Sequence, residues 1–303
     1  FKAKEFFFDH SLISVKNNYA EFSHNNYPGI APAFSTGLST LIGHWNEIYP
    51  KAGLTLMFIP PLIIISRFFD NNFFLISISI ILFIIGKFLV NGELDGLVAL
   101  YFVSSVIIIY NLKNLNNNIF YQYLILIFFL IILSLLKAEG IVLLLCSFIG
   151  SMFTFYKKKY LCKNLIILFF VSIIPVLMWN YFCIYNNIGN INNNNIFNVN
   201  DFTNRILYLK NYILIFEYLL LNEKFLFGLF IFLLSTIYIK NKDILIYVSS
   251  ISLIYILFLF IIYLSTSLDL EWHLNSASRI IKPIALFLSI FSLYSIFNKQ
   301  NKI

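Results

Sequence analysis

Long apolar runs separated by short polar segments make up most of this chain. A helix needs about 20 predominantly apolar residues, in a range of roughly 17 to 25, to cross the hydrocarbon core of a bilayer. By that measure the pattern predicts nine transmembrane helices, at about 51–66, 73–90, 96–112, 119–136, 138–156, 164–185, 224–239, 244–266 and 279–297. The predicted fold class is therefore an all-α polytopic membrane protein with about nine transmembrane helices.

Two further segments mix apolar and polar residues. Residues 31–45 contain glycines, serines and threonines, and residues 205–221 include Arg205, Lys210 and Glu217. A mixed helix of this kind can rest in the membrane interface without crossing it. We expect both to be juxtamembrane helices on the outer face. The resulting division is an extracytoplasmic segment at 1–50 and a transmembrane domain at 51–303, with an outer loop and interfacial helix at about 186–223.

The composition agrees with a membrane protein. Of 303 residues, 60% are hydrophobic and 12% are charged, and the mean hydropathy is +0.83, whereas a soluble domain is about half apolar and about one quarter charged. The net charge of +7 is spread among loops and forms no basic patch with interleaved aromatic residues, which excludes nucleic acid as a partner. The three cysteines, Cys146, Cys162 and Cys183, show neither metal-ligand nor disulfide spacing, so no metal site is predicted.

The basic residues predict the orientation of the chain. Lys157, Lys158, Lys159 and Lys163 crowd one short loop, which favours the cytoplasmic side for that loop. Alternation of the spans then puts every acidic residue except Asp70 and Asp243, and all four histidines, on the outer face. Any acid–base chemistry is expected on that face.

Four polar segments of the predicted outer face carry side chains capable of chemistry. The N-terminal segment contains Lys4, His24 and Tyr27, and Tyr27 precedes a proline, which favours an extended backbone. The next segment is a tight turn with Glu93 and Asp95, whose carboxylates can reach a common point. Each segment also fits a plainer interpretation, as an ordinary loop or as a turn with solvated acids.

The other two segments border apolar runs directly. Lys137 and Glu139 lie between two such runs, where charges are either mutually paired or face a cavity; snorkelling of a helix end is the alternative. His273 and Arg279 precede the last apolar run, with Arg279 expected about one turn inside that helix. A guanidinium there could bind a phosphate through two parallel hydrogen bonds, or it could serve as an interfacial anchor.

The ordered set of segments resembles the polytopic glycosyltransferases of the GT-C superfamily, which include protein O-mannosyltransferases and aminoarabinose transferases. The similarity extends over nearly the whole chain. It rests on KAKEFF at 2–7, HNNYPGIAPAF at 24–34, GELDGLVALYF at 92–102, LKAEG at 136–140 with Ala138 in place of an expected Asn, and WHLNSASRIIKPIALFL at 272–288. No single motif is specific, but their order is fairly specific.

The resemblance implies transfer of a sugar from a polyprenyl-phosphate donor to a glycan, lipid or protein acceptor, on the outer side of a bacterial inner membrane. It implies that Arg279, backed by Lys137 and His273, binds the phosphate, that Glu93 and Asp95 hold acceptor hydroxyls or a divalent cation, that Glu139 orients Lys137, and that His24 and Tyr27 shape the sugar pocket. Lys4 is counted among the substrate-binding residues. The catalytic acid of the family is expected a few residues before Phe1, so we expect a fragment without a signal peptide and assign no catalytic residue.

Two other functions remain open at the level of sequence. A flippase, polymerase or carrier of lipid-linked glycans would place ionisable groups near the middle of its spans. Asp and Glu are almost absent there, which favours an enzyme with its site on the outer face. A non-catalytic membrane scaffold is the third interpretation.

Overall fold

Helices account for all the regular structure in the computed structural model, which describes residues 2–12, 27–69, 71–91, 93–114, 119–188, 199–238 and 242–297. Several of these helices are long and apolar enough to cross a bilayer. The predicted fold class, an all-α polytopic membrane protein, is confirmed.

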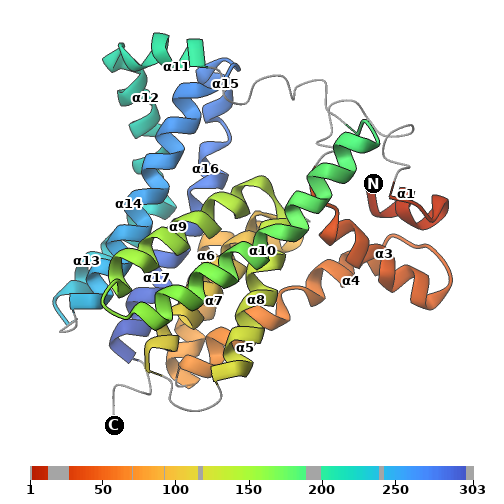
Figure 1. The fold of residues 1–303 in the computed structure, drawn as a ribbon, viewed down its shortest axis with the longest axis horizontal. Helices are drawn as coiled ribbons and strands as arrows, with labels where there is room; N and C mark the ends of the chain where they lie inside the picture. Colours follow the sequence, from red (N-terminus) through yellow and green to blue (C-terminus); the bar gives the residue numbers. More distant parts are fainter. Residues whose placement is uncertain are drawn as a thin grey trace.

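Figure 1 shows the helices along the chain. The first half of the chain forms α1 (Lys2–Asp9), α3 (Ile30–Ile42), α4 (Tyr49–Leu56), α5 (Ile59–Phe68), α6 (Asn71–Asn91), α7 (Asp95–Asn111), the 3-10 turn η1 (Leu112–Asn114), α8 (Ile119–Leu136) and α9 (Ala138–Phe155). The second half forms α10 (Lys159–Tyr185), α11 (Val199–Ile206), α12 (Leu209–Leu220), α13 (Glu223–Thr236), α14 (Lys242–Ser265), α15 (Leu270–Leu274), α16 (Ala277–Ile280) and α17 (Lys282–Phe297).

The number of membrane crossings is only partly fixed by helix length. Five described segments are long and apolar enough to cross: Tyr49–Phe68, Ala138–Phe155, Lys159–Tyr185, Lys242–Ser265 and Leu270–Phe297. A sixth is present if α12 and α13, which meet at 73°, form one broken span. Shorter apolar helices occupy 30–42, 73–87, 95–111 and 120–136. Each of the nine predicted spans thus contains a helix, and the count of nine crossings stays a prediction.

Helix α7 is the centre of the bundle, since all its residues are buried. Its apolar residues occur on every side, which is typical of a helix surrounded by protein. Helix α17 packs along α7, and α6, α8 and α9 cover other sides. Buried polar groups are generally hydrogen-bonded, and between these two helices the hydroxyl of Tyr294 on α17 donates to Oδ1 of Asn111 on α7 at 2.7 Å.

Close helix packing depends on small residues at two places. A Cβ at Gly228 would lie 2.5 Å from the carbonyl oxygen of Ala285, and a Cβ at Gly150 would lie 2.4 Å from the side chain of Ile251. Small residues let the backbones of membrane helices approach each other. These contacts hold α13 against α17 and α9 against α14.

Prolines break two of the predicted spans. The span expected at 51–66 is divided into α4 and α5, with Pro60 and Pro61 at the start of α5, where a missing backbone N–H is tolerated. Within the last candidate span, Leu270–Phe297, helix α17 starts at Lys282. Because Pro283 cannot donate to the carbonyl of Arg279, the helix is interrupted there. Arg279 thus lies inside the last candidate span, as expected, but it belongs to the short helix α16, directly before α17.

Most of the segment predicted as an interfacial helix at 205–221 forms α12, and its first two residues end α11; its place in the membrane interface stays a prediction. Helix α11 ends at Ile206, and α12 starts after Tyr208, whose backbone is extended. Two side chains of α12 bind carbonyls at the break: Asn211 Nδ2 donates to Arg205 at 3.0 Å, and the Tyr212 hydroxyl donates to Ile206 at 3.1 Å. Such side-chain bonds compete with the continuation of a helix.

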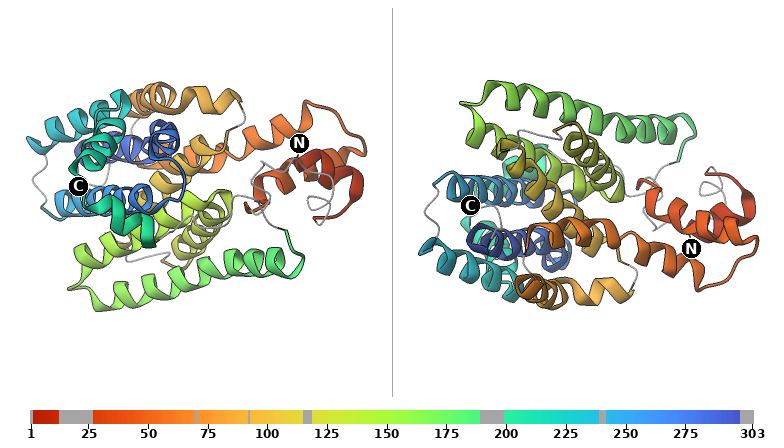
Figure 2. Two further views of the ribbon diagram at one scale, coloured as in Figure 1. Left: turned by 90° about the horizontal axis from the view of Figure 1, so that it is seen from above. Right: turned by 90° about the horizontal axis from the view of Figure 1, so that it is seen from below.

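The N-terminal helices lie at one end of the molecule, beyond the main bundle (Figure 2). Helix α3 falls within the segment predicted as helical at 31–45 and ends at Gly43, whose φ of +86° favours glycine. The Thr36 hydroxyl of α3 donates to the carbonyl of Ala3 on α1 at 2.8 Å. The position of α3 in the membrane interface stays a prediction.

Candidate functional site

The tight junction between α8 and α9 positions the first charged side chains. Lys137 is the residue between the two helices, and its backbone is extended, with φ −162° and ψ 158°. The chain turns so sharply that a Cβ at residue 140 would lie 2.0 Å from the carbonyl oxygen of Leu133, so Gly140 is needed here. The turn directs Lys137 towards the start of α7.

Lys137 is held by two carboxylates. Its Nζ lies 2.9 Å from Oδ1 of Asp95, the first residue of α7, and 3.2 Å from Oε1 of Glu139 on α9. The three side chains are 15%, 8% and 22% exposed, so the ion network is largely removed from solvent. Of the two arrangements that the sequence left open for Lys137 and Glu139, the structure shows mutual pairing and adds Asp95 from 42 residues away.

The carboxylates of Asp95 and Glu139 determine the protonation state of Lys137. Burial alone would lower the pKa of Lys137, but the Glu139 and Asp95 carboxylates outweigh burial and raise this pKa. An opposite charge within a few Å favours the charged form of a side chain. Lys137 therefore stays an ammonium ion throughout the physiological pH range.

Tyr27 lies beside this network. Burial raises its pKa to about 12, and Glu139, Lys137, Asp95 and Arg279 are all close enough to contribute. The phenol is therefore neutral. Tyr27 belongs to the first predicted polar segment, and the charges that influence its pKa come from the other three. The structure therefore brings all four predicted segments together.

The remaining acid of the predicted turn lies near a further lysine. Lys282, the first residue of α17, is within electrostatic reach of Asp95 and Glu93. Sequence reasoning missed Lys282 because it treated residues 279–297 as one apolar span. A charged residue directly before a proline in such a run was the available signal, since ionisable residues within membrane segments generally mark functional positions.

Helices α15 and α16 supply the other wall of the site. The His273 ring packs on the Tyr263 ring of α14, with 4.9 Å between ring centroids, and lies close enough to Glu139 for electrostatic influence. The Tyr263 hydroxyl is 3.2 Å from Oγ of Ser276. Figure 1 shows α15, α16 and α17 following one another alongside α14. Arg279 is exposed, and its guanidinium has no ion pair with any residue that the structure describes.

Glu139 and His273 each have one buried polar atom without a hydrogen-bond partner among the described residues. They are Oε2 of Glu139 and Nδ1 of His273. An unpaired buried polar atom costs about 1–3 kcal/mol, so such atoms require a reason. A ligand that donates to Glu139 and bonds to His273 would supply the missing partners.

Two of the predicted residues stand apart. Lys4 is exposed on α1, and no contact joins it to Lys137 or its partners within the described ranges. His24 lies outside the described residues. We therefore draw the site from Tyr27, Glu93, Asp95, Lys137, Glu139, His273 and Arg279, and add Lys282.

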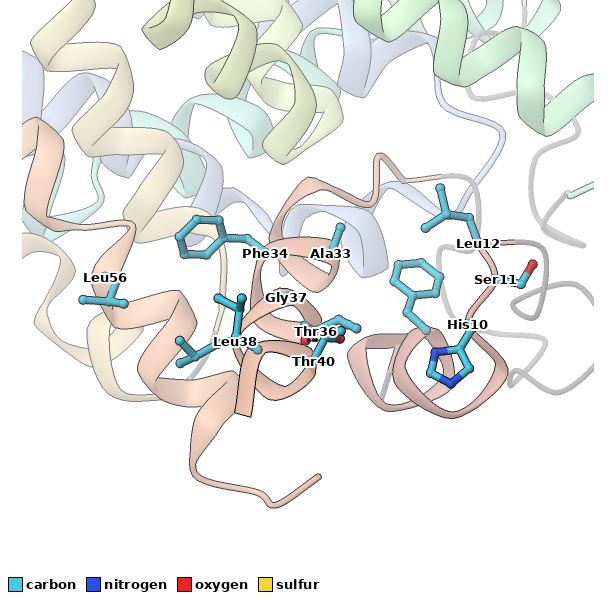
Figure 3. Close-up of a pocket in the computed structure, with 12 residues that line it drawn as sticks. His10, Ser11, Leu12, Ala33, Phe34, Thr36, Gly37, Leu38, Thr40 and Leu56 are labelled. Atoms are coloured by element: carbon cyan, nitrogen blue, oxygen red, sulfur yellow. Dashed lines mark hydrogen bonds between the residues drawn. The ribbon is translucent and has the colours of Figure 1, made fainter. Parts of the chain in front are cut away.

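A pocket at the N-terminal helices does not coincide with this site (Figure 3). It measures about 690 Å³ and is lined by side chains of the N-terminal helices, including Phe6, Phe34 and Leu38. The hydroxyls of Thr36 and Thr40 in its wall already donate to backbone carbonyls. Its lining is mainly apolar, with His10 at one edge, and none of the paired charged residues described above lines it, so we base the site on those charged residues and not on this pocket.

In the described part of the chain, no group of three or more His, Cys, Asp or Glu residues is placed to hold a metal ion. Lys137 occupies the space between Asp95 and Glu139 that a cation would otherwise take. Comparisons with protein-family models, with curated proteins and with solved structures found no match for this chain. The functional argument therefore rests on the geometry of the site.

Proposed function

We propose that this protein is a membrane glycosyltransferase that transfers a sugar from a polyprenyl-phosphate donor to an acceptor at the outer face of the membrane. The observation that carries the proposal is how the two carboxylate oxygens of Glu139 are bonded. Lys137 holds one of its carboxylate oxygens at 3.2 Å, while the other oxygen is buried without a partner in the described residues, near Tyr27 and His273. A fixed carboxylate with one available oxygen is suited to hold the hydroxyl or amine of an acceptor.

The donor is bound by a different group. Arg279 is exposed beside the same site and has no described carboxylate as a partner. A guanidinium forms two parallel hydrogen bonds to a phosphate. Lys137, in contrast, is already neutralised by Asp95 and Glu139. Arg279 is accordingly the phosphate ligand, and Lys137 is the group that holds the carboxylates in place.

The reaction follows from these two positions. The acceptor atom, bound to Glu139, attacks the anomeric carbon, and the bond from that carbon to the phosphate oxygen breaks. The acceptor proton passes to a carboxylate base, and the negative charge that develops on the leaving lipid phosphate is stabilised by Arg279. The resemblance expects the base at an acid before Phe1, so we assign acceptor binding to Glu139, and proton removal is not assigned to a described residue.

Binding of a polyprenyl phosphate tests the role of Arg279. The protein is placed in lipid nanodiscs and titrated with the lipid, for wild type, for Arg279→Gln and for Lys242→Gln, which removes an exposed cation at the start of α14. We expect Kd to rise at least about tenfold for Arg279→Gln, equivalent to about 1.4 kcal/mol. The control variant should bind like wild type. Equal affinities for both variants would remove Arg279 from the phosphate site.

A transfer assay with a labelled polyprenyl-phosphate sugar tests Glu139. Glu139→Gln should retain the affinity for the lipid phosphate but lose transfer by about 100-fold, in the range typical for loss of one positioned catalytic or binding group. If the wild-type protein moves lipid-linked sugar between leaflets without forming a glycosidic bond, the carrier interpretation replaces this one.

A further inference from the structure

Arg205 binds the turn that leads into the site. This residue lies near the end of α11, and its guanidinium donates to three backbone carbonyls that follow or end α14. Nη1 donates to Thr266 at 2.7 Å and to Tyr263 at 3.3 Å, and Nη2 donates to Leu268 at 2.8 Å. The last carbonyls of a helix have no intrahelical partner, and a basic side chain is well suited to bind them.

The carbonyls bound by Arg205 belong to the residues that support the site. Tyr263 gives its backbone oxygen to Arg205, while its ring packs on His273 and its hydroxyl contacts Ser276. The carbonyl of Ser276 in turn accepts from the backbone N–H of Arg279 at 3.0 Å. A continuous series of direct contacts therefore joins Arg205 to the phosphate ligand.

We propose that Arg205 is a positioning residue: by fixing the turn between α14 and α15, it places His273 and Arg279 opposite Lys137 and its carboxylates. The position of Arg205 near the end of α11 gives no sign of this role in the sequence, because its partners lie 58 to 63 residues away. The positioning rests on geometry alone, and its effect on lipid binding rests on the proposed function.

Two variants of Arg205 distinguish its role in positioning the turn from the effect of its positive charge. Arg205→Gln removes the fork of donors, and Arg205→Lys keeps the positive charge but cannot reach three carbonyls at once. Lys210→Gln is the matched control, since Lys210 is an exposed cation on the neighbouring helix α12 without a described partner. Thermal unfolding of all three variants shows whether the fold survives.

Hydrogen exchange of the backbone amides is the first measurement and needs no ligand. In Arg205→Gln, the amides of α15 and α16 should exchange at least about tenfold faster than in wild type, while those of α7 and α17 keep their protection. The exchange rates of α15 and α16 in Arg205→Lys should lie between those of wild type and Arg205→Gln. The rates in Lys210→Gln should match wild type. Unchanged exchange at α15 and α16, or an equal increase throughout the bundle, would overturn the proposal.

A double-mutant cycle on polyprenyl-phosphate binding is the second measurement. Arg205→Gln should raise Kd about fivefold to tenfold when Arg279 is present and by less than about twofold when Arg279 is already Gln. The reason is that the effects of two mutations within one network of contacts are generally not additive. Additive losses would overturn the link between Arg205 and Arg279. If wild-type protein binds no polyprenyl phosphate, the proposed function fails, and hydrogen exchange alone decides the positioning role.

Discussion

Two lysines near opposite ends of α7 are buried in different ways. Lys137, near the first residue of α7, is 15% exposed and lies within 3.2 Å of two carboxylates that are themselves 8% and 22% exposed. Lys113, just after the end of α7, is 8% exposed, yet its only acidic neighbour among the described residues, Asp243, is 4.0 Å away and 61% exposed. The Lys113 ammonium instead lies 3.8 Å from the centre of the Tyr110 ring and donates to the Tyr110 hydroxyl.

The pKa values of the two lysines shift in opposite directions. Burial lowers the pKa of Lys113, and Asp243 offsets only part of this effect, whereas the carboxylates at Lys137 reverse it. The Lys113 end is thus closed by aromatic contact and hydrogen bonds. The Lys137 end keeps a charged group and leaves two polar atoms, on Glu139 and His273, without described partners. Of the two ends, the Lys137 end is the one with buried polar atoms to which a ligand could bond.

Replacement of the two lysines by methionine is the strongest test of this comparison. Lys137→Met leaves Asp95 and Glu139 without their counter-charge and should cost about 3–5 kcal/mol of stability, as for other broken buried pairs. Lys113→Met frees an acid that already reaches water, so it should cost about 0–1 kcal/mol. The measurement is thermal or denaturant unfolding in detergent, with exposed Lys159→Met as the neutral control. Equal losses of stability in Lys113→Met and Lys137→Met would show that the two ends of α7 hold their lysines in the same way.

The junction between α8 and α9 sharpens the comparison with a smaller effect. Gly140→Ala puts a Cβ within 2.0 Å of the Leu133 carbonyl oxygen, so the junction must open and Lys137 must move. We expect a loss of about 1–3 kcal/mol, as for other overpacked sites, together with slower sugar transfer, because Glu139 loses its fixed position. Gly37→Ala on α3 meets nothing within 4 Å and is the matched control. Wild-type stability in Gly140→Ala would mean that the junction is not tightly packed.

A third lysine, Lys2, is expected to give the smallest effect on stability. At this residue burial is the largest influence on the pKa. Burial lowers the pKa of Lys2 on α1 from 10.5 to about 8. Between pH 8 and 10.5 the unfolded chain therefore binds more protons at Lys2 than the folded chain, and the contribution of this residue to stability rises with pH in that window. The difference in unfolding free energy between wild type and Lys2→Met should change across this window. Exposed Lys4→Met should show no such change.

The helical spans could be predicted from apolar run lengths, because membrane-buried backbone must satisfy its own hydrogen bonds. Their ends were less predictable. Pro283 interrupts the last span after Arg279, and the side chains of Asn211 and Tyr212 separate α11 from α12. In both places a local hydrogen-bonding detail outweighed an apolar pattern that looked continuous.

Part of the site could also be predicted. Glu93, Asp95, Lys137, Glu139, His273 and Arg279 stood out because charged residues next to apolar runs are costly without a purpose. Lys282 and Arg205 did not stand out. Lys282 was hidden inside an apolar run, and the partners of Arg205 are backbone carbonyls, which leave no mark in a sequence.

By itself the sequence determined that this is a helical membrane protein and which polar residues border its spans, since both follow from the cost of placing polar groups in hydrocarbon. Only the tertiary structure decided which of those residues meet. It placed Asp95 against Lys137, left one oxygen of Glu139 without a described partner, and tied the Arg279 segment to Arg205. These contacts join residues far apart in the chain, and they depend on how the helices pack rather than on any local pattern of residues.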